Sequence, residues 1–221
     1  MTLKKLLKTI SVENIMGNTD IDISGISYDS RKVGKNYLFA CIDGFKTDGH
    51  LYIKDAVNKG AIALLVGKNR SHRRTTTDKN VVFIKVQDVR LALAKISAEF
   101  YGNPSKKMKI IGITGTNGKT TSAFLIESIL KKAKYNPGVI GTIVYKIGKN
   151  KIAATNTTPE SLEIQKIFSE MLRNNCDYAV MEVSSHALEL NRVASTEFDA
   201  AIFTNLTQDH LDFHKTMNEY L

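Results

Sequence analysis

The pattern of apolar and polar residues predicts alternating strands and helices along the first hundred residues. Apolar residues three or four apart fit an amphipathic helix near the start, at Leu3, Leu6, Leu7 and Ile10. Alternation of apolar and polar residues over 21–28 fits a half-buried strand. Near-continuous apolar runs predict buried strands at 37–42, which we expect to be central, and at 61–66 and 81–86, with helices at 52–58 and 88–100. Such alternation is typical of an α/β domain.

A second set of elements follows residues 102–107, whose Gly-Asn-Pro start ends the preceding helical pattern. We place a domain boundary there, which divides the chain into residues 1–102 and 103–221. The second part is expected to contain strands at 108–113, 139–143, 177–182 and 200–203, helices at 119–134 and 159–172, and a hairpin over 144–154. Thr158 reads as the cap of the second helix. The run at 200–203 reads as a buried parallel strand.

The segment between the strand at 108–113 and the helix at 119–134 has the composition of a phosphate-binding loop. In Gly115-Thr-Asn-Gly-Lys-Thr-Thr121, backbone N–H groups and the helix dipole would converge on a phosphate. Lys119 would then contact the β- and γ-phosphates, and the Thr120 hydroxyl would bind Mg²⁺. The standard pattern wants glycine where Ile113 stands, so an ordinary glycine-rich turn is the alternative.

Polar residues follow the later strands at the edge where this loop is expected. Glu182 ends an apolar strand, the place of the second acidic Mg²⁺ ligand in phosphate-loop proteins, and a structural salt bridge is the alternative. Asn205 and His210 follow the strand at 200–203. Because Mg²⁺ prefers oxygen ligands, the residue pattern alone leaves His210 open between an orienting role and a core role. The polar run 156–158 could offer hydroxyls and an amide to a ligand.

Composition and charge narrow the classes of function. The 221-residue chain is 43% hydrophobic and 24% charged, and it has no apolar run of the roughly 20 residues that a membrane helix needs. The start of the chain lacks a signal-peptide core, so we expect a cytoplasmic protein without a membrane partner. We also expect a monomer. The net charge of +9 could attract nucleic acid, but its basic clusters at 68–74 and 106–109 lack interleaved aromatic residues, which favours polyanionic small molecules. Cys41 and Cys176 read as buried free thiols.

Three stretches together resemble the Mur ligases, the ATP-dependent enzymes that build the peptide stem of bacterial cell-wall precursors. They are Gly115-Thr-Asn-Gly-Lys-Thr-Thr121, Met181-Glu-Val-Ser-Ser-His186 and Thr204-Asn-Leu-Thr-Gln-Asp-His-Leu-Asp212. Four further motifs are similar to the member that adds the third amino acid to UDP-N-acetylmuramoyl-L-alanyl-D-glutamate: Tyr28-Asp-Ser-Arg-Lys32, Gly44-Phe-Lys-Thr-Asp-Gly49, Asn156-Thr-Thr-Pro159 and Ser184-Ser-His-Ala-Leu188. The resemblance implies a small N-terminal α/β domain that binds the UDP-substrate, followed by an incomplete phosphate-loop central domain with a mostly parallel sheet.

The resemblance also implies a reaction and a set of site residues. ATP would phosphorylate the D-glutamyl γ-carboxylate, and the amine of a diamino acid such as meso-diaminopimelate or L-lysine would attack the acyl phosphate. ATP would be held by Gly115, Thr116, Asn117, Gly118, Lys119, Thr120, Thr121 and Asn205, with Lys119, Glu182 and His210 as catalytic residues. Thr120 and Glu182 would hold one Mg²⁺, and Glu182 with His210 would hold a second. The UDP part of the substrate would contact Ser30, Phe45, Lys46 and Thr47, and the muramoyl-dipeptide Asn156, Thr157, Thr158, Ser184 and Arg192. Leu190 stands where some relatives have glutamine.

Two alternatives and one expectation about the chain's extent remain. A folylpolyglutamate synthetase-like ligase would share the phosphate loop but would not need the first domain or its Asp-Ser-Arg motif. A basic nucleic-acid-binding module is the second alternative. Since the chain stops within a helical pattern at 218–221, we expect a fragment without the amino-acid-binding domain, which would bind the UDP-substrate but form no amide alone.

Overall fold

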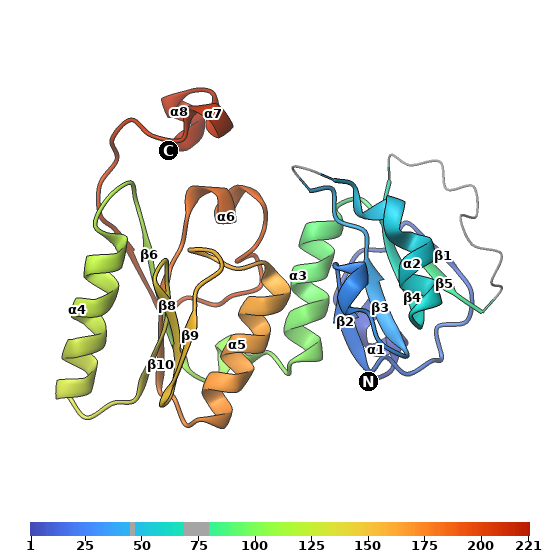
Figure 1. Cartoon of the computed structure of the whole chain (residues 1–221), viewed down its shortest axis with the longest axis horizontal. Coiled ribbons are helices and arrows are strands. Elements are labelled where there is room, and N and C mark those ends of the chain that lie inside the picture. The colour runs from blue at the N-terminus through green and yellow to red at the C-terminus, as the bar shows by residue number, and fades with distance from the viewer. Residues whose placement is uncertain (45–46, 69–79) are drawn as a thin grey trace. The chain divides into compact units, whose positions relative to one another are not determined.

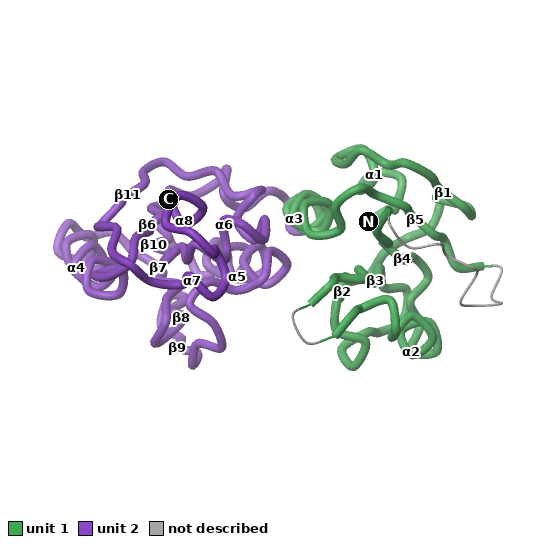
Figure 2. Tube along the Cα trace, turned by 90° about the horizontal axis from the view of Figure 1, so that it is seen from above, with its two compact units in different colours: residues 1–100 green, residues 101–221 purple. Residues whose placement is uncertain are grey.

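The computed structural model describes residues 1–44, 47–68 and 80–221, which form two compact units, Met1–Phe100 and Tyr101–Leu221 (Figure 2). Phe45 and Lys46, and most of the basic cluster at 68–74, lie outside the described residues. Each unit is an α/β layer structure with its own sheet (Figure 1). The predicted α/β class with mostly parallel sheets is therefore confirmed.

The first unit holds a five-stranded sheet of order β1-β5-β4-β3-β2. Its strands are β1 (Asn14–Met16), β2 (Gly25–Ser27), β3 (Tyr37–Ala40), β4 (Ala61–Gly67) and β5 (Val82–Val86), and its helices are α1 (Leu3–Leu7), α2 (Ile53–Asn58) and α3 (Val89–Phe100). Strands β2 to β5 run parallel, and both α2 and α3 contact β4. The predicted half-buried strand over 21–28 is shorter than expected, and the three residues of β2 are all buried. The short β1 was not predicted, because all three of its residues are exposed and show no apolar pattern.

The strands of this unit are covered on both faces, so neighbouring apolar residues along a strand are all buried. Phe39 and Leu64 pack with Ile53 of α2 in one cluster, while the neighbouring Leu38 and Leu65 are also fully buried. Alternate side chains of a strand point to opposite faces, so a strand covered on both sides reads as a continuous apolar run. The expected buried state of both cysteines is confirmed, and burial raises the pKa of each thiol.

The second unit holds a six-stranded sheet of order β11-β6-β10-β7-β8-β9. Its strands are β6 (Lys109–Thr114), β7 (Pro137–Ile140), β8 (Val144–Ile147), β9 (Asn150–Ala153), β10 (Tyr178–Glu182) and β11 (Ala200–Phe203). Its helices are α4 (Lys119–Lys132), α5 (Ser161–Arg173), α6 (Ser185–Glu189), α7 (Leu211–His214) and α8 (Met217–Tyr220). The first four strands in this order are parallel, and β8 and β9 form the predicted antiparallel hairpin.

Helices α4 and α5 cover this sheet, and their burial patterns explain the apolar spacing of the sequence. Ala123 of α4 packs against Ile113 of β6 and Val180 of β10, while Phe168 of α5 packs in a larger cluster with Met181. Val180 and Met181 are neighbours on β10 and point to opposite faces, so the two helices lie on opposite sides of the sheet (Figure 1). Because β11, β6, β10 and β7 run parallel, their carboxyl ends lie at the same end of the sheet, and this end carries the candidate site.

Two predictions about this unit are wrong. Strand β11 is not buried: Ile202 is 37% and Phe203 57% exposed, because β11 pairs only with β6 and forms the sheet edge among the described strands. Thr158 is not a helix cap, because α5 begins three residues later with Glu160 at the cap position. The Thr158 side chain is instead buried and bonded to a different segment, as described below.

Candidate functional site

The strand–turn–helix from β6 to α4 forms the predicted loop. Gly115 and Gly118 have φ angles of 126° and 86°, which side chains rarely tolerate. A Cβ on Gly115 would also lie 2.8 Å from the carbonyl oxygen of Asn205, so the chain has room only for glycine there. Gly118 occupies the cap position of the 14-residue helix α4. The helix thus begins at Lys119 with its unpaired N–H groups at the loop, the arrangement that binds phosphates.

The segment 204–207 after β11 holds this loop in place. Asn205 accepts a hydrogen bond from the Asn117 N–H (3.1 Å) and donates its amide to the Asn117 carbonyl (3.1 Å). The Thr204 hydroxyl donates to the same carbonyl (2.7 Å), and Thr207 exchanges hydrogen bonds with Thr116 at 3.0 and 3.1 Å. In this structure Asn205 therefore shapes the loop, and its predicted contact with ATP stays a prediction.

A cavity of about 290 Å³ lies over the loop and brings the predicted nucleotide and metal residues together. It is lined by Thr116, Asn117, Gly118, Lys119, Thr120, Thr121, Thr142, Thr157 and Glu182. The Lys119 ammonium donates to the carbonyls of Gly115 (2.6 Å) and Thr116 (3.0 Å), which keeps this cation at the loop.

Glu182 ends β10 directly beside β6, and the residue is only 2% exposed. Three groups donate to it: the Thr120 hydroxyl (2.9 Å), the Thr142 hydroxyl (3.0 Å) and the Thr142 N–H (3.1 Å). No ion pair joins it to a cation among the described residues, so the predicted alternative of a salt bridge finds no partner there. A buried carboxylate without a cation is costly, and hydroxyl plus carboxylate oxygen suits a hard cation. Two ligands of an octahedral Mg²⁺ lie about 3 Å apart, and the Thr120 and Glu182 oxygens match that spacing.

A second cavity of about 260 Å³ gathers the residues predicted to hold the muramoyl-dipeptide. It is lined by Lys119, Asn156, Thr157, Thr158, Ser184, His186, Arg192 and His210. Lys119 and Thr157 line both cavities, so the two adjoin at these side chains. His210 lies on this second cavity and is not among the residues around Glu182, so its role as a Mg²⁺ ligand stays a prediction.

The polar run 156–158 is fixed by bonds to residues distant in the sequence. The Tyr145 hydroxyl donates to the Asn156 carbonyl (2.6 Å) and accepts from its N–H (3.2 Å). The Thr158 hydroxyl, 1% exposed as a residue, donates to the Glu182 carbonyl (2.9 Å) and accepts from the Ser184 N–H (3.0 Å). Thr158 therefore ties the run to the end of β10. Its own contact with a ligand is not shown.

Arg192 lies at the edge of the second cavity and contacts the same run. Its guanidinium donates to the Thr158 carbonyl (3.1 Å) and forms an ion pair with Glu160 at 2.8 Å. The cation is thus held in place and only 16% of its side chain is exposed. Ser184 caps the short helix α6 through its hydroxyl, which accepts from the Ala187 N–H (3.3 Å).

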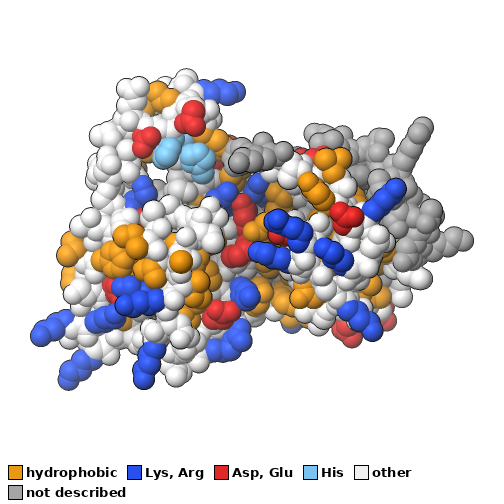
Figure 3. Space-filling view, in the orientation of Figure 1, with side chains coloured by type: hydrophobic (Ala, Val, Ile, Leu, Met, Phe, Trp, Pro, Cys, Tyr) orange, Lys and Arg blue, Asp and Glu red, His pale blue; other side chains and the backbone are white. Residues whose placement is uncertain are grey.

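Helix α6 and the start and end of α7 bring three histidines into contact beside the second cavity. The His186 ring stacks on Phe213 at 4.1 Å between centroids and meets His210 edge-on at 4.9 Å. The His214 ring is buried and shares a hydrogen bond with the Ser185 hydroxyl (2.9 Å). Burial, and next the charges of His210 and His214, lower the pKa of His186. Figure 3 shows histidine side chains gathered on this face of the molecule.

The predicted UDP-binding residues of the first unit follow the ends of β2 and β3. Ser30 is buried at the start of a short 3₁₀ turn (Ser30–Lys32), whose cap Asp29 forms a bidentate ion pair with Arg31. The guanidinium of Arg31 lowers the pKa of the Asp29 carboxyl. Thr47 donates its hydroxyl to Tyr52 (3.1 Å), and Phe45 and Lys46 are outside the described residues. The substrate contacts of this unit stay predictions.

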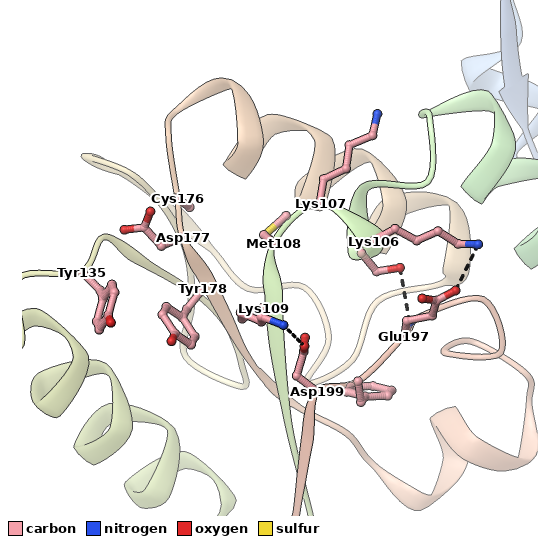
Figure 4. A pocket seen from close by; sticks show the side chains of 12 residues that line it. Lys106, Lys107, Met108, Lys109, Tyr135, Cys176, Asp177, Tyr178, Glu197 and Asp199 are labelled. Atoms are coloured by element: carbon pink, nitrogen blue, oxygen red, sulfur yellow. Dashed lines mark hydrogen bonds and ion pairs between the residues drawn. The ribbon is translucent and has the colours of Figure 1, made fainter.

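Two other polar clusters have internal explanations. Asp43, Asp48 and His50 could hold a metal by their spacing, but the His50 Nδ1 already bonds the Asp48 carboxylate at 2.6 Å. A cavity of about 690 Å³ lies at the opposite edge of the second sheet, beneath β6, β10 and β11 (Figure 4). Two of the lysines that line it pair with its acids, Lys109 with Asp199 (2.7 Å) and Lys106 with Glu197 (3.2 Å), whereas Lys107 points away from them (Figure 4). Neither cluster shares a residue with the linings of the two smaller cavities described above.

Several site residues were missed in the sequence. The sequence pattern predicts Thr142 near the end of a strand and Tyr145 in a hairpin, but it gives no sign of their polar contacts, which lie far along the chain. Thr204 and Thr207 flank Asn205 in a stretch already marked as polar, so that stretch could have been predicted to hold the loop as a whole. His186 is the last residue of the Met181-to-His186 motif, so it could have been predicted as a site residue from that motif.

Comparisons with known proteins find one family model for each of the two units. A family model described as the Mur ligase middle domain matches residues 113–221, and one described as Mur ligase family, catalytic domain, matches residues 22–101. The UDP-N-acetylmuramoyl-L-alanyl-D-glutamate–2,6-diaminopimelate ligase of Clostridium tetani is 51% identical over 220 residues, which cover 100% of this chain and 45% of that protein. The protein of the same name from Clostridium botulinum is 53% identical over 220 residues, with the same two shares.

A solved structure gives the same result for the fold. The structure of a UDP-N-acetylmuramoyl-L-alanyl-D-glutamate–2,6-diaminopimelate ligase has a TM-score of 0.79 and 25% identity, and covers 100% of this chain and 43% of its own. The chain thus spans less than half the length of these relatives. Among the helices that the structure describes, none is both long and apolar enough to cross a membrane.

Proposed function

Starting from the finding that this chain belongs to the Mur ligase family, we propose that it supplies the UDP-substrate domain and part of the ATPase domain of a ligase. The ligase would join the third amino acid, 2,6-diaminopimelate by the names of its relatives, to UDP-N-acetylmuramoyl-L-alanyl-D-glutamate. One observation carries the proposal. The phosphate-loop cavity and the cavity with the predicted dipeptide residues adjoin at Lys119 and Thr157.

In the proposed reaction the D-glutamyl γ-carboxylate attacks the γ-phosphorus of ATP, the bond to the β–γ bridging oxygen breaks, and ADP leaves. The amino-acid nitrogen then attacks the acyl carbon and the C–O bond to phosphate breaks, with the proton lost by the nitrogen leaving on the phosphate, to give the amide. Lys119 and the start of α4 would hold the phosphates and offset the charge that develops on the γ-phosphoryl group. Since Lys119 faces both cavities, it is placed to hold the two reactants in contact.

Thr120 and Glu182 are the residues that would hold Mg²⁺, and their spacing fits that ion. The cation would supply charge neutralisation at the phosphate oxygens. Asn156, Thr157, Ser184 and Arg192 would contact the muramoyl-dipeptide in the second cavity, with Ser30 and Thr47 on the UDP part. His210 would hold a second Mg²⁺ together with Glu182, as the family resemblance implies.

The test is ligand binding by the chain itself, measured as the thermal stabilisation that each ligand produces. UDP-N-acetylmuramoyl-L-alanyl-D-glutamate at 100 times its dissociation constant should stabilise the chain by about 2.7 kcal/mol. Lys119→Met should abolish stabilisation by Mg²⁺·ADP, whereas Lys149→Met, at the exposed hairpin turn, should not. Stabilisation by a folate alone would support a folylpolyglutamate synthetase-like ligase instead. Tight binding of duplex or single-stranded DNA at physiological salt, with no response to the UDP-sugar, would support a nucleic-acid-binding module.

A further inference from the structure

The loop after β7 brings a backbone group and a hydroxyl of one residue to the predicted metal ligand. Thr142 contacts both carboxylate oxygens of Glu182, with its N–H on Oε1 (3.1 Å) and its hydroxyl on Oε2 (3.0 Å). The chain approaches closely because Gly141 precedes it: a Cβ there would collide with Glu182 Oε1. Together these contacts fix the rotation of the carboxylate, and Oε2 is the oxygen that also faces Thr120.

The Thr142 hydroxyl has a second partner on the other side. Its oxygen lies 3.1 Å from the Thr157 hydroxyl, and Thr157 lines both cavities. One hydroxyl carries one proton, and bonds to a carboxylate are the stronger ones, so the Thr142 proton belongs on Glu182. Thr157 then donates to Thr142. The three residues form a directed chain of hydrogen bonds from the wall of the second cavity to the carboxylate.

We infer that Thr142 is a positioning residue that orients Glu182 for its cation, and that Thr157 strengthens this orientation through the Thr142 hydroxyl. A hydroxyl that accepts a hydrogen bond becomes a better donor, so the Thr157 bond reinforces the bond to Glu182. Residues that orient a metal ligand in this way affect metal affinity although they do not touch the metal. The inference rests on the proposed function, since it takes Glu182 as a cation ligand.

The test is a double-mutant cycle on cation affinity. Mn²⁺ replaces Mg²⁺ as the probe, and its binding to the chain with ADP present is measured by electron paramagnetic resonance. Thr142→Val should weaken Mn²⁺ about tenfold, and Thr142→Ser should restore it. Thr157→Val should weaken Mn²⁺ about threefold although it does not contact Glu182, and the double variant should be no weaker than Thr142→Val. Thr155→Val, at an exposed position directly before the run 156–158, serves as the control.

Affinity for ADP without divalent cation is measured on each variant, because general damage to the fold would lower it and an effect on Glu182 alone would not. Unchanged Mn²⁺ affinity in Thr142→Val, failure of Thr142→Ser to restore it, or additive losses in the double variant would overturn the inference. If the unmodified chain binds neither ADP nor Mn²⁺·ADP, the proposed function fails and the inference fails with it. If the unmodified chain binds Mn²⁺·ADP and Thr142→Val binds it equally well, only the inference fails.

Discussion

Replacement of Thr158 by valine tests whether this residue acts as a structural tie between the polar run and β10. Valine keeps the shape of the side chain but removes the hydroxyl, leaving the Glu182 carbonyl and the Ser184 N–H without their partner. Each unpaired group costs about 1–3 kcal/mol when buried, and the Ser184 N–H is partly buried, so a loss of about 3 kcal/mol is expected. Thr158→Ser keeps the hydroxyl and loses one methyl group, at about 1 kcal/mol.

The measurement is urea unfolding, monitored by circular dichroism. With a slope of about 2 kcal/mol/M, Thr158→Val should lower the midpoint of the second unit by about 1.5 M. Thr157→Val, one residue away and partly exposed, should change stability by less than about 0.5 kcal/mol. A Thr158→Val midpoint within error of the unmodified chain would refute the reasoning. The predicted contact of Thr158 with the muramoyl-dipeptide would then be the remaining role for its hydroxyl.

Two further predictions concern residues outside the cavity linings. Burial tends to raise the pKa of Glu127, but hydrogen bonds from Lys131 and Lys146, both at 2.6 Å, outweigh it and lower that pKa. Its contribution, about 2 kcal/mol by comparison with Glu127→Gln, should be present above the unfolded-state pKa of about 4.3 and lost as pH falls through the folded-state value. Equal stability gaps at neutral and strongly acidic pH in urea titrations would contradict this. Tyr145→Phe should weaken the UDP-substrate about tenfold in calorimetry by releasing Asn156, with Mn²⁺·ADP affinity unchanged; equal losses for both ligands would point to general disruption.

Local chemistry explains why the centre of the site could be predicted from the sequence. The positive φ angles of Gly115 and Gly118 and the position of Glu182 at a strand end depend on residues next to them. The hairpin at β8–β9 likewise follows from alternation and a turn between them. Where neighbours along the chain decide the structure, a pattern is enough.

The errors have the opposite cause. Thr158 precedes a proline and looks like a cap, but its hydroxyl bonds the Glu182 carbonyl 24 residues away. The apolar sequence of β11 is typical of a buried strand, yet its exposure depends on which strands lie beside it. Thr142 could not be recognised because the Gly-Thr-Ile sequence gives no sign of the carboxylate 40 residues further on. Such contacts exist only once the sheet order brings the strands together.

The adjacency of the two cavities is the central claim, and paramagnetic broadening tests it most directly. The chain is loaded with UDP-N-acetylmuramoyl-L-alanyl-D-glutamate carrying ¹³C at the D-glutamyl γ-carboxyl carbon, and with ADP and either Mg²⁺ or Mn²⁺. Shared lining at Lys119 and Thr157 predicts strong broadening of the γ-carboxyl signal by Mn²⁺·ADP and none by Mg²⁺·ADP. A sharp γ-carboxyl signal while both ligands are shown to be bound would contradict the account.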